Sequence, residues 1–439
     1  MNEMKCGPSS ILTFIFVLFC PQFGSFEDCN CRVDPEQIHL SIGNLENEFF
    51  VTWVTFCTTE KSIVWFGTAN EGITSAVEGC CSAFVDGGNA KVVRYIHRVS
   101  LRGLKPDTYY IYRCGSSCGV SGTYLFKTFP CGTQWSPRLI IFGDMGLSCA
   151  YTLPYIHKDV GTGCVDALVH VGDIAYNLDT YNGYVGDDFM KLVEPIATRV
   201  PYMVAAGNHE CAYNFSHFKY RYTMPGYSEG LFYSFNMGPA HFVVISTEVY
   251  YFTQYGYDPL VNQLKWLERD LRIANDPNYR RVRPWIIVLG HRPMYCSSDN
   301  REDCAMETNI LRFCQSGPCE IGLESIFFRY GVDIAFWGHM HYYERSWPIF
   351  NGVVYNGSYY RPYTNARATI HVVTGAAGMK SGTERITYIR SDRFPFYSNH
   401  YSYTRLLVLN ETFLLIEQVS ANNGGAVIDK FCVVKDICQ

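Results

Sequence analysis

Five apolar, strand-like runs in this 439-residue chain each end in glycine, followed at once by a residue that can bind a metal ion. The runs and their endings are Arg138–Phe142 with Gly143-Asp144, Ala167–Val171 with Gly172-Asp173, residues 203–206 with Gly207-Asn208-His209, Trp285–Leu289 with Gly290-His291, and residues 332–337 with Gly338-His339-Met340-His341. Ligands gather beyond the carboxyl ends of strands in open α/β sheets, and histidine is the commonest transition-metal ligand. One such ending is equally well a surface loop, but the fivefold repetition predicts a metal site built from five loops.

Length and composition narrow the possible classes of fold and function. A chain of 439 residues is too long for one ordinary core and predicts two domains. The formal net charge of −5 provides no basic footprint, so a nucleic-acid partner is not expected. The 33 tyrosines and 29 phenylalanines favour a sheet-rich architecture.

The pattern of strands and helices changes near residue 135. Residues 33–130 contain short β-rich runs separated by polar turns, which predict a small all-β sandwich. Within it, Arg94 and His97 are interpreted as ordinary surface or sheet residues. Residues 135–439 alternate strands with helical segments, predicted at 187–198, 259–274 and 320–330, which indicates α/β layering. Closing strands are expected at 369–374, 405–409 and 413–418.

The N-terminus and the cysteines indicate an extracytoplasmic route. Lys5 and the apolar residues 11–19 predict a secretory signal, assigned to residues 1–25, and neither this run nor any later one is long enough to span a membrane. Without Cys6 and Cys20, 17 cysteines remain, which predicts disulfides and either a free thiol or an intermolecular bridge. Glycosylation is predicted at Asn214, Asn356 and Asn410. The protein is therefore expected to be secreted or lysosomal, as a monomer or a homodimer.

The five motifs together resemble those of the purple acid phosphatases, a family within the metallophosphoesterase superfamily. They read GDMG (143–146), GDIAY (172–176), GNHE (207–210), LGH (289–291) and GHMH (338–341), in the order and spacing typical of that family. The β-rich front half resembles the N-terminal domain of the large plant-type members, which include animal proteins. The resemblance implies a fibronectin-III-like β-sandwich followed by an α/β/β/α sandwich catalytic domain.

The resemblance also implies a ligand set for two metal ions. Asp144, Tyr176 and His341 would hold one ion, and Asp173 would bridge to the second. Asn208, His291 and His339 would complete the second site. Two carboxylates and a phenolate suit Fe(III), whereas an amide and two imidazoles suit a divalent Zn, Fe or Mn ion. A buried core tyrosine is the competing interpretation of Tyr176, and Asp173 three residues earlier favours the ligand.

The activity implied is hydrolysis of small-molecule or protein phosphate monoesters by a metal-bound hydroxide at an Fe(III)–M(II) centre. His209 is predicted to contact a phosphate oxygen or the leaving group, and its alternative role is to orient another ligand. Family members resembling this chain have a further histidine after the position of His291, but here none precedes His339. The general acid is therefore unassigned, although Asp299, Glu302 and Asp303 lie in this segment.

Several other interpretations remain open from the sequence. The same metal site could serve a phosphodiesterase or nucleotidase, the iron could generate reactive oxygen species, or the β-domain could be a binding module beside a vestigial site. The last alternative predicts a lost ligand, but all seven positions are filled. Cys149, Cys164 and Cys211 are expected to form disulfides rather than to act as reactive thiols.

Overall fold

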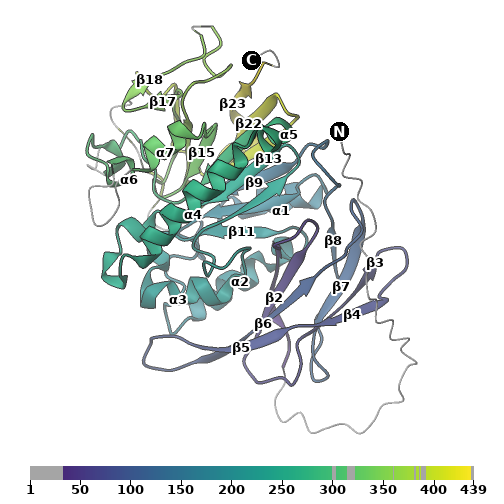
Figure 1. Cartoon of the computed structure of the whole chain (residues 1–439). Coiled ribbons are helices and arrows are strands. Elements are labelled where there is room, and N and C mark those ends of the chain that lie inside the picture. Colours follow the sequence, from purple (N-terminus) through teal and green to yellow (C-terminus); the bar gives the residue numbers. More distant parts are fainter. Residues whose placement is uncertain are drawn as a thin grey trace. The chain divides into compact units, whose positions relative to one another are not determined.

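The structure is a computed structural model that describes residues 33–298, 303–313, 322–358, 360–379, 382–384, 386 and 392–436. The predicted signal segment lies outside the described residues. Residues 33–436 belong to one compact unit, which begins with a β-sandwich (Figure 1). Its strands are β1 (Glu36–Ile42), β2 (Phe49–Thr55), β3 (Ile63–Thr68), β4 (Ser75–Glu78), β5 (Cys80–Val85), β6 (Val93–Leu101), β7 (Tyr109–Gly115) and β8 (Tyr124–Lys127). They form two antiparallel sheets, ordered β1-β2-β6-β5 and β4-β3-β7-β8.

Two larger mixed sheets follow. The first is ordered β11-β10-β9-β21-β22-β23 and the second β12-β13-β14-β15-β19-β16-β20. The strands of the first are β9 (Arg138–Phe142), β10 (Ala167–Val171), β11 (Tyr202–Ala205), β21 (Ser402–Val408), β22 (Phe413–Ser420) and β23 (Ala426–Val434). Those of the second are β12 (Tyr233–Met237), β13 (Ala240–Val244), β14 (Trp285–Leu289), β15 (Ile334–Trp337), β16 (Tyr343–Arg345), β19 (Ile370–Thr374) and β20 (Phe396–Ser398). A small hairpin, β17 (Ile349–Phe350) with β18 (Val353–Val354), stands apart from both.

The strands that precede the predicted ligands are parallel neighbours in these two sheets. β10 pairs in parallel with both β9 and β11, and β14 pairs in parallel with β15. All five strands are almost fully buried and rich in β-branched residues, as expected for parallel strands covered on both faces. Their carboxyl ends therefore place three loops at one edge of the first sheet and two loops at one edge of the second.

Helices cover the outer faces of the two sheets, and the inner faces pack on each other. The helices are α1 (Leu153–Gly161), α2 (Tyr184–Ala197), α3 (Ala212–Arg221), α4 (Asp258–Ala274), α5 (Pro277–Val282), α6 (Ile310–Phe313) and α7 (Leu323–Arg329), with short 3-10 turns at Asn208–Glu210, Glu248–Tyr250, Thr253–Tyr255 and Asp303–Ala305. Apolar residues of α1 and α2 join the core of the first sheet, and those of α4 and α7 pack on the second. One core cluster contains Leu139 of the first sheet and Leu289 of the second. The α/β/β/α sandwich behind a β-sandwich is thus confirmed.

The predicted helices and closing strands coincide closely with α2, α4, α7, β19, β21 and β22, although residues 320 and 321 lie outside the described part. Arg94 and His97 are sheet residues of β6, as one of the two interpretations had it, but neither lies at the surface. Both side chains are fully buried. His97 stacks on Trp53 at a centroid distance of 4.9 Å and hydrogen-bonds to Thr55 and Ser62 at 2.9 and 2.8 Å.

Arg94 belongs to an ion cluster that joins the β-sandwich to the part built on the two larger sheets. Its Nε and Nη2 donate to the two carboxylate oxygens of Asp187 on α2 at 2.8 and 2.7 Å. Arg221 of α3 donates to the same carboxylate at 2.8 Å, and Gln37 of β1 donates to it at 3.1 Å. A buried charge that loses its partner is strongly destabilising, so this cluster couples the two parts of the fold.

His217 lies beside this cluster and is held neutral. Arg221 Nε, which can only donate, lies 3.3 Å from His217 Nδ1, and His217 Nε2 lies 3.2 Å from a carboxylate oxygen of Asp86. Burial, and then the positive charges of Arg221 and Arg94, lower the pKa of His217 to about 3, against the attraction of Asp86. Because this folded-state pKa lies below the unfolded value of about 6.5, the stabilisation is complete above pH 6.5 and is lost as the pH falls toward 3.

We predict that the free energy of unfolding falls between pH 6.5 and 4, with His217 contributing up to about 1.4 kcal/mol per pH unit. Urea unfolding at several pH values should therefore give a shallower pH slope for His217→Gln than for the parent chain. The control is His157→Gln, which alters an exposed histidine and should leave the slope unchanged. Parallel slopes for the parent and His217→Gln would contradict a neutral, buried His217.

Candidate metal centre

The loops after β9, β10 and β15 bring together three donor atoms, which we call the tyrosine cluster: Asp144, Tyr176 and His341. Tyr176 Oη lies 3.2 Å from Asp144 Oδ1 and 3.0 Å from His341 Nε2. His341 Nε2 in turn lies 3.4 Å from Asp144 Oδ1. Three atoms about 3 Å apart, from segments far apart in the chain, form a nearly equilateral triangle.

The loops after β10, β11, β14 and β15 form a second group, which we call the histidine cluster: Asp173, Asn208, His291 and His339. His291 Nε2 lies 3.1 Å from Asn208 Oδ1 and 3.3 Å from Asp173 Oδ1. One ligand atom each of Asp173, His291 and His339 lies within 4.8 Å of the others. All seven residues predicted as ligands therefore lie in one of the two clusters.

Both clusters have the geometry and chemistry that a metal ion requires. Ligands bound about 2.1 Å from an ion lie roughly 3 Å from one another, which matches the separations in both groups. In the histidine cluster, carboxylate and amide oxygens face an imidazole nitrogen, so a positive charge is needed among them. Burial disfavours a charged His291, but the charge of Asp173 outweighs it and raises the pKa of His291 to about 10. The donor set thus fits a cation.

Partners on the side away from the clusters fix the orientation of the His291 and His341 rings. His291 Nδ1 lies 2.9 Å from the carbonyl oxygen of Val171, to which its N–H donates, and this leaves Nε2 as the atom that faces the cluster. His341 Nδ1 lies 3.3 Å from a carboxylate oxygen of Glu384, so that His341 Nε2 faces Tyr176. Such partners fix the tautomer of a metal-binding histidine.

The glycines before the ligands are required by close contact between loops. Gly172 has φ of +87°, and a Cβ there would lie 2.5 Å from His291 Nδ1. A Cβ on Gly207 would lie 2.3 Å from Asp173 Oδ1. Left-handed backbone also occurs at four predicted ligands, Asp144, Asp173, Tyr176 and His339, with φ between 49° and 69°. Such strain in non-glycine residues is concentrated at functional sites.

His209 is near the clusters but not in their tight contacts. Its backbone N–H donates to Asp173 Oδ1 at 2.9 Å, and its Nε2 lies 3.8 Å from Asp173 Oδ2. The ring packs edge-on against Tyr176 at a centroid distance of 4.6 Å, and Nδ1 lies 2.8 Å from Asn177 Oδ1. With 35% of its side chain exposed, His209 can meet a molecule arriving from solvent.

Sequence reasoning missed a second layer of residues, of which Glu210 is the most connected. Its buried carboxylate accepts hydrogen bonds from the backbone N–H groups of Asp173, Ile174 and Gly207, each at 2.9 Å. Burial, and then the charge of Asp173, raise the pKa of Glu210 to about 8, while the N–H donors oppose the shift. Glu210 is the third residue of the turn Asn208–Glu210 and reaches back to the N–H of Gly207, as the glutamate of a capping box does, so this role could have been predicted from the sequence.

Arg292, directly after His291, is a second missed residue. Its Nη1 lies 3.0 Å from His339 Nε2, and its guanidinium lies 4.4 Å from the centroid of Tyr251. Its Nε donates to both carboxylate oxygens of the buried Glu248, at 3.2 and 3.0 Å. No recognised motif marks this arginine, so only the structure places it at the clusters.

The remaining candidates lie elsewhere or are engaged otherwise. Asp303 accepts hydrogen bonds from Tyr251, Asn309 and the N–H of Ile310, which is a structural role, and Asp299 and Glu302 lie outside the described residues. The predicted disulfides of Cys149, Cys164 and Cys211 are wrong, because these thiols are free; a bond joins Cys296 to Cys304 instead. The side chains of Asn214, Asn356 and Asn410 are exposed, and their glycosylation stays a prediction.

Comparison with known proteins agrees with this arrangement. Three family models match the chain: Purple acid Phosphatase, N-terminal domain, at residues 35–128; Calcineurin-like phosphoesterase at 137–343; and Iron/zinc purple acid phosphatase-like protein C at 368–430. Acid phosphatase type 7 of Mus musculus is 46% identical over 92% of each chain, and that of Homo sapiens is 46% identical over 92% of this chain and 91% of its own. The chain belongs to the purple acid phosphatase family.

A solved structure supports the same assignment. A purple acid phosphatase from yellow lupin (Lupinus luteus) seeds superposes with a TM-score of 0.76 and 26% identity, covering 92% of this chain and 75% of its own. A binuclear metal centre is typical of purple acid phosphatases. In this member, two adjacent donor clusters lie where the loops of the two sheets meet.

We predict that Glu210→Gln destabilises the metal loops of this family member by about 2 kcal/mol. In the variant, an amide nitrogen would face a backbone N–H group that now donates a hydrogen bond to the carboxylate. Thermal unfolding and metal analysis of the purified protein should show a lower Tm and a reduced metal content. Glu229→Gln, at a largely exposed glutamate, is the matched control and should change neither. An unchanged Tm and metal content in Glu210→Gln would remove Glu210 from this supporting role.

Proposed function

We propose that this protein is an acid phosphatase that hydrolyses phosphate monoesters, of small molecules or of proteins, at a binuclear metal centre. The observation that carries the proposal is the pair of donor clusters with Asp173 between them. Asp173 contacts His291 directly, and its charge also acts on Tyr176 and His341 of the tyrosine cluster. A shared carboxylate between two ligand groups is what a bridged metal pair requires.

We assign Fe(III) to Asp144, Tyr176 and His341 with Asp173, and a divalent Zn, Fe or Mn ion to Asp173, Asn208, His291 and His339. Burial of the side chain, and then the negative charges of Asp144 and Asp173, raise the pKa of Tyr176 far above its usual value. Phenolate formation there therefore needs a highly charged cation, and hard anionic oxygens prefer a trivalent ion. The uncharged amide and imidazoles of the other cluster suit a divalent ion.

When bound, such a metal pair supplies Lewis acidity and lowers the pKa of a coordinated water. The residues of the chain would then position the ester and neutralise its charge. Arg292, fixed by Glu248 and stacked on Tyr251, places a guanidinium beside His339, where a phosphate oxygen would lie. His209, whose Nε2 faces Asp173 from the exposed side, would contact a phosphate oxygen or the departing alcohol.

The setting proposed for this activity is extracellular or lysosomal. The predicted signal segment, the sequons and the Cys296–Cys304 disulfide support an oxidising route. Among the described residues, no helix combines the length and apolar character needed to cross a bilayer.

Asp173→Asn tests the bridge. We predict that it lowers the bound metal per chain and reduces kcat for p-nitrophenyl phosphate by more than about 100-fold. Mutation of a residue that only hydrogen-bonds to a metal ligand already costs up to about 100-fold in metal affinity or activity, and Asp173 is itself a proposed ligand. Metal analysis and steady-state kinetics at acidic pH measure both effects. Asp188→Asn, on an exposed carboxylate of α2, is the control and should behave like the parent. Full metal content with retained turnover in Asp173→Asn would disprove the bridging role.

His209→Ala separates substrate contact from metal support. If His209 contacts the phosphate or leaving group, kcat should fall by roughly 10²–10⁴-fold while metal content and visible spectrum stay as in the parent. Asn177→Ala, which only removes the partner of His209 Nδ1, should have a smaller effect on kcat. Loss of metal in His209→Ala would instead support the alternative role, in which His209 orients a ligand.

A further inference from the structure

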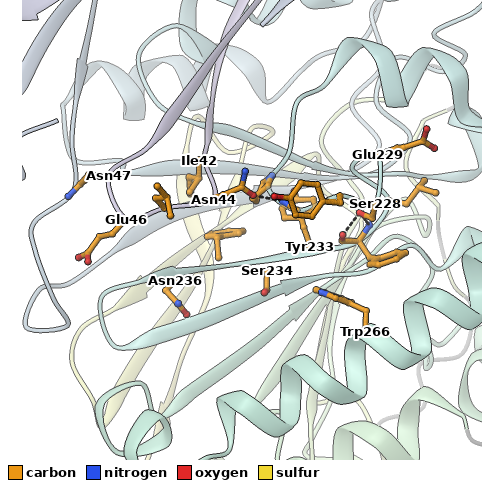
Figure 2. A pocket seen from close by; sticks show the side chains of 18 of the residues that line it. Ile42, Asn44, Glu46, Asn47, Ser228, Glu229, Tyr233, Ser234, Asn236 and Trp266 are labelled. Carbon is orange, nitrogen blue, oxygen red and sulfur yellow. Dashed lines mark hydrogen bonds between the residues drawn. The ribbon is translucent and has the colours of Figure 1, made fainter. Parts of the chain in front are cut away.

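One well-formed cavity is separate from the metal centre. It measures about 990 Å³ and lies between the loops 42–47 and 129–135 of the front part and the segment 225–238 with α4. None of the seven predicted ligands, nor His209, is among its lining residues. Figure 2 shows side chains from these segments around it, including Asn44, Asn236 and Trp266. Pockets of this size at the junction of two structural parts commonly bind small organic ligands.

Two asparagines that line this cavity, Asn44 and Asn47, keep their amide donors free, and a third, Asn236, contacts a histidine. Asn44 Oδ1 accepts from the N–H of Gly226 at 2.7 Å, and Asn47 Oδ1 accepts from the N–H of Phe129 at 3.0 Å. Asn236 Oδ1 lies 2.8 Å from His241 Nδ1. Within the described part of the chain, no hydrogen bond uses the Nδ2 group of Asn44 or Asn47. The acceptors of these two side chains are thus occupied, whereas their N–H donors remain available.

Hydrogen bonds to Asp270 hold in place the side of the cavity that contains Asn236 and Ser234. His241 Nε2 lies 2.8 Å from Asp270 Oδ2, and Ser234 Oγ donates to Asp270 Oδ1 at 2.7 Å. Ser234 therefore uses its hydrogen internally and retains oxygen lone pairs as acceptors for a ligand in the cavity that it lines. Arg283 also lines the cavity, and its Nε is buried without a hydrogen-bond partner among the described residues.

Aromatic rings provide the apolar part of the lining. Trp266 of α4 packs on Phe232 at a centroid distance of 5.0 Å, and Trp135 stacks on Phe129 at 5.7 Å. Tyr227 is fully exposed and also lines the cavity. The negative face of an aromatic ring attracts weakly positive C–H groups. A pyranose ring presents such C–H groups on its faces and hydroxyl groups at its edge.

The charge of the lining disfavours an anionic ligand. Three carboxylates, Glu46, Glu229 and Asp258, line the cavity with only two cations, and one cation, Lys219, pairs with Glu229 at 2.9 Å. A phosphate or sulfate group would meet a slight excess of negative charge. A ligand with neutral hydroxyl groups would instead find amide donors, carboxylate and hydroxyl acceptors, and aromatic faces.

We propose that this cavity binds a neutral oligosaccharide, with Asn44 donating to its oxygens, Asn236 hydrogen-bonding to its hydroxyl groups and Trp266 packing on a sugar face. The glycan can come from another molecule or from this protein's own predicted glycosylation sites. The proposal is independent of phosphate hydrolysis, because the cavity shares no residue with the metal clusters.

The test uses the full chain with Asn214, Asn356 and Asn410 changed to Gln, so that its own glycans are absent. Isothermal titration with mannotriose, chitotriose and cellotriose should show saturable binding of at least one of them. Trp266→Ala should weaken that binding by about tenfold or more, as should the double variant Asn44→Ala with Asn236→Ala. Tyr279→Ala, on an exposed tyrosine outside the cavity, is the control and should bind like the parent. All variants should hydrolyse p-nitrophenyl phosphate normally.

Every outcome decides the proposal. Absence of binding by all three sugars, or binding that neither cavity variant weakens, would overturn it, and the double variant covers the case in which Trp266→Ala fails to fold. Preference for inorganic phosphate over the neutral sugars at this cavity would also overturn it. If the glycosylated parent chain binds added sugar only after its glycans are removed, the occupant is its own glycan; if it binds directly, the occupant comes from another molecule.

Discussion

Close backbone contact between the loops after β10 and β11 is the constraint on which the metal centre depends. Gly207 approaches Asp173 so closely that a single added carbon would collide with the carboxylate. Glu210 then joins the two loops through three hydrogen bonds to backbone N–H groups. Because Asp173 also lies beside His291 of the other sheet, this one junction sets the position of both donor clusters. Left-handed backbone at several ligands is tolerated because the surrounding contacts hold it.

The negative electrostatic potential at these loops favours the binding of a cation. The carboxylates that keep Tyr176 protonated in the protein's own field also create the negative potential that a trivalent ion would occupy. The same field draws a positive charge to His291. Behind the ligands, Glu384, Glu248 and Val171 orient imidazoles or a guanidinium, so the donor atoms are arranged before a metal binds. Such preorganisation is what a hydrolytic metal centre needs.

Much of this arrangement could be predicted from the sequence, because the apolar strand runs and the glycines that end them are local features of the chain. Buried strands ending in glycine and a ligand predicted five loops at strand ends, and the two sheets with their covering helices confirmed the layered fold. Interactions across long sequence separations were not readable. Arg94 lies in a strand, as predicted, but its buried ion pair with Asp187, 93 positions away, could not be predicted. Arg292 has no motif, and its neighbours Glu248 and His339 lie 44 and 47 positions away. Cysteine pairing was likewise beyond the sequence, as the free thiols of Cys149, Cys164 and Cys211 show.

The most direct test of this account is the visible absorption spectrum of the purified protein after expression with iron. The account predicts a broad tyrosinate-to-Fe(III) band that is present in the parent chain and absent from Tyr176→Phe. Tyr124→Phe, which changes a tyrosine of β8 in the β-sandwich that hydrogen-bonds to Glu194, should keep the band. A colourless parent protein that binds two metal ions and cleaves phosphate esters would contradict the ferric assignment at Asp144, Tyr176 and His341.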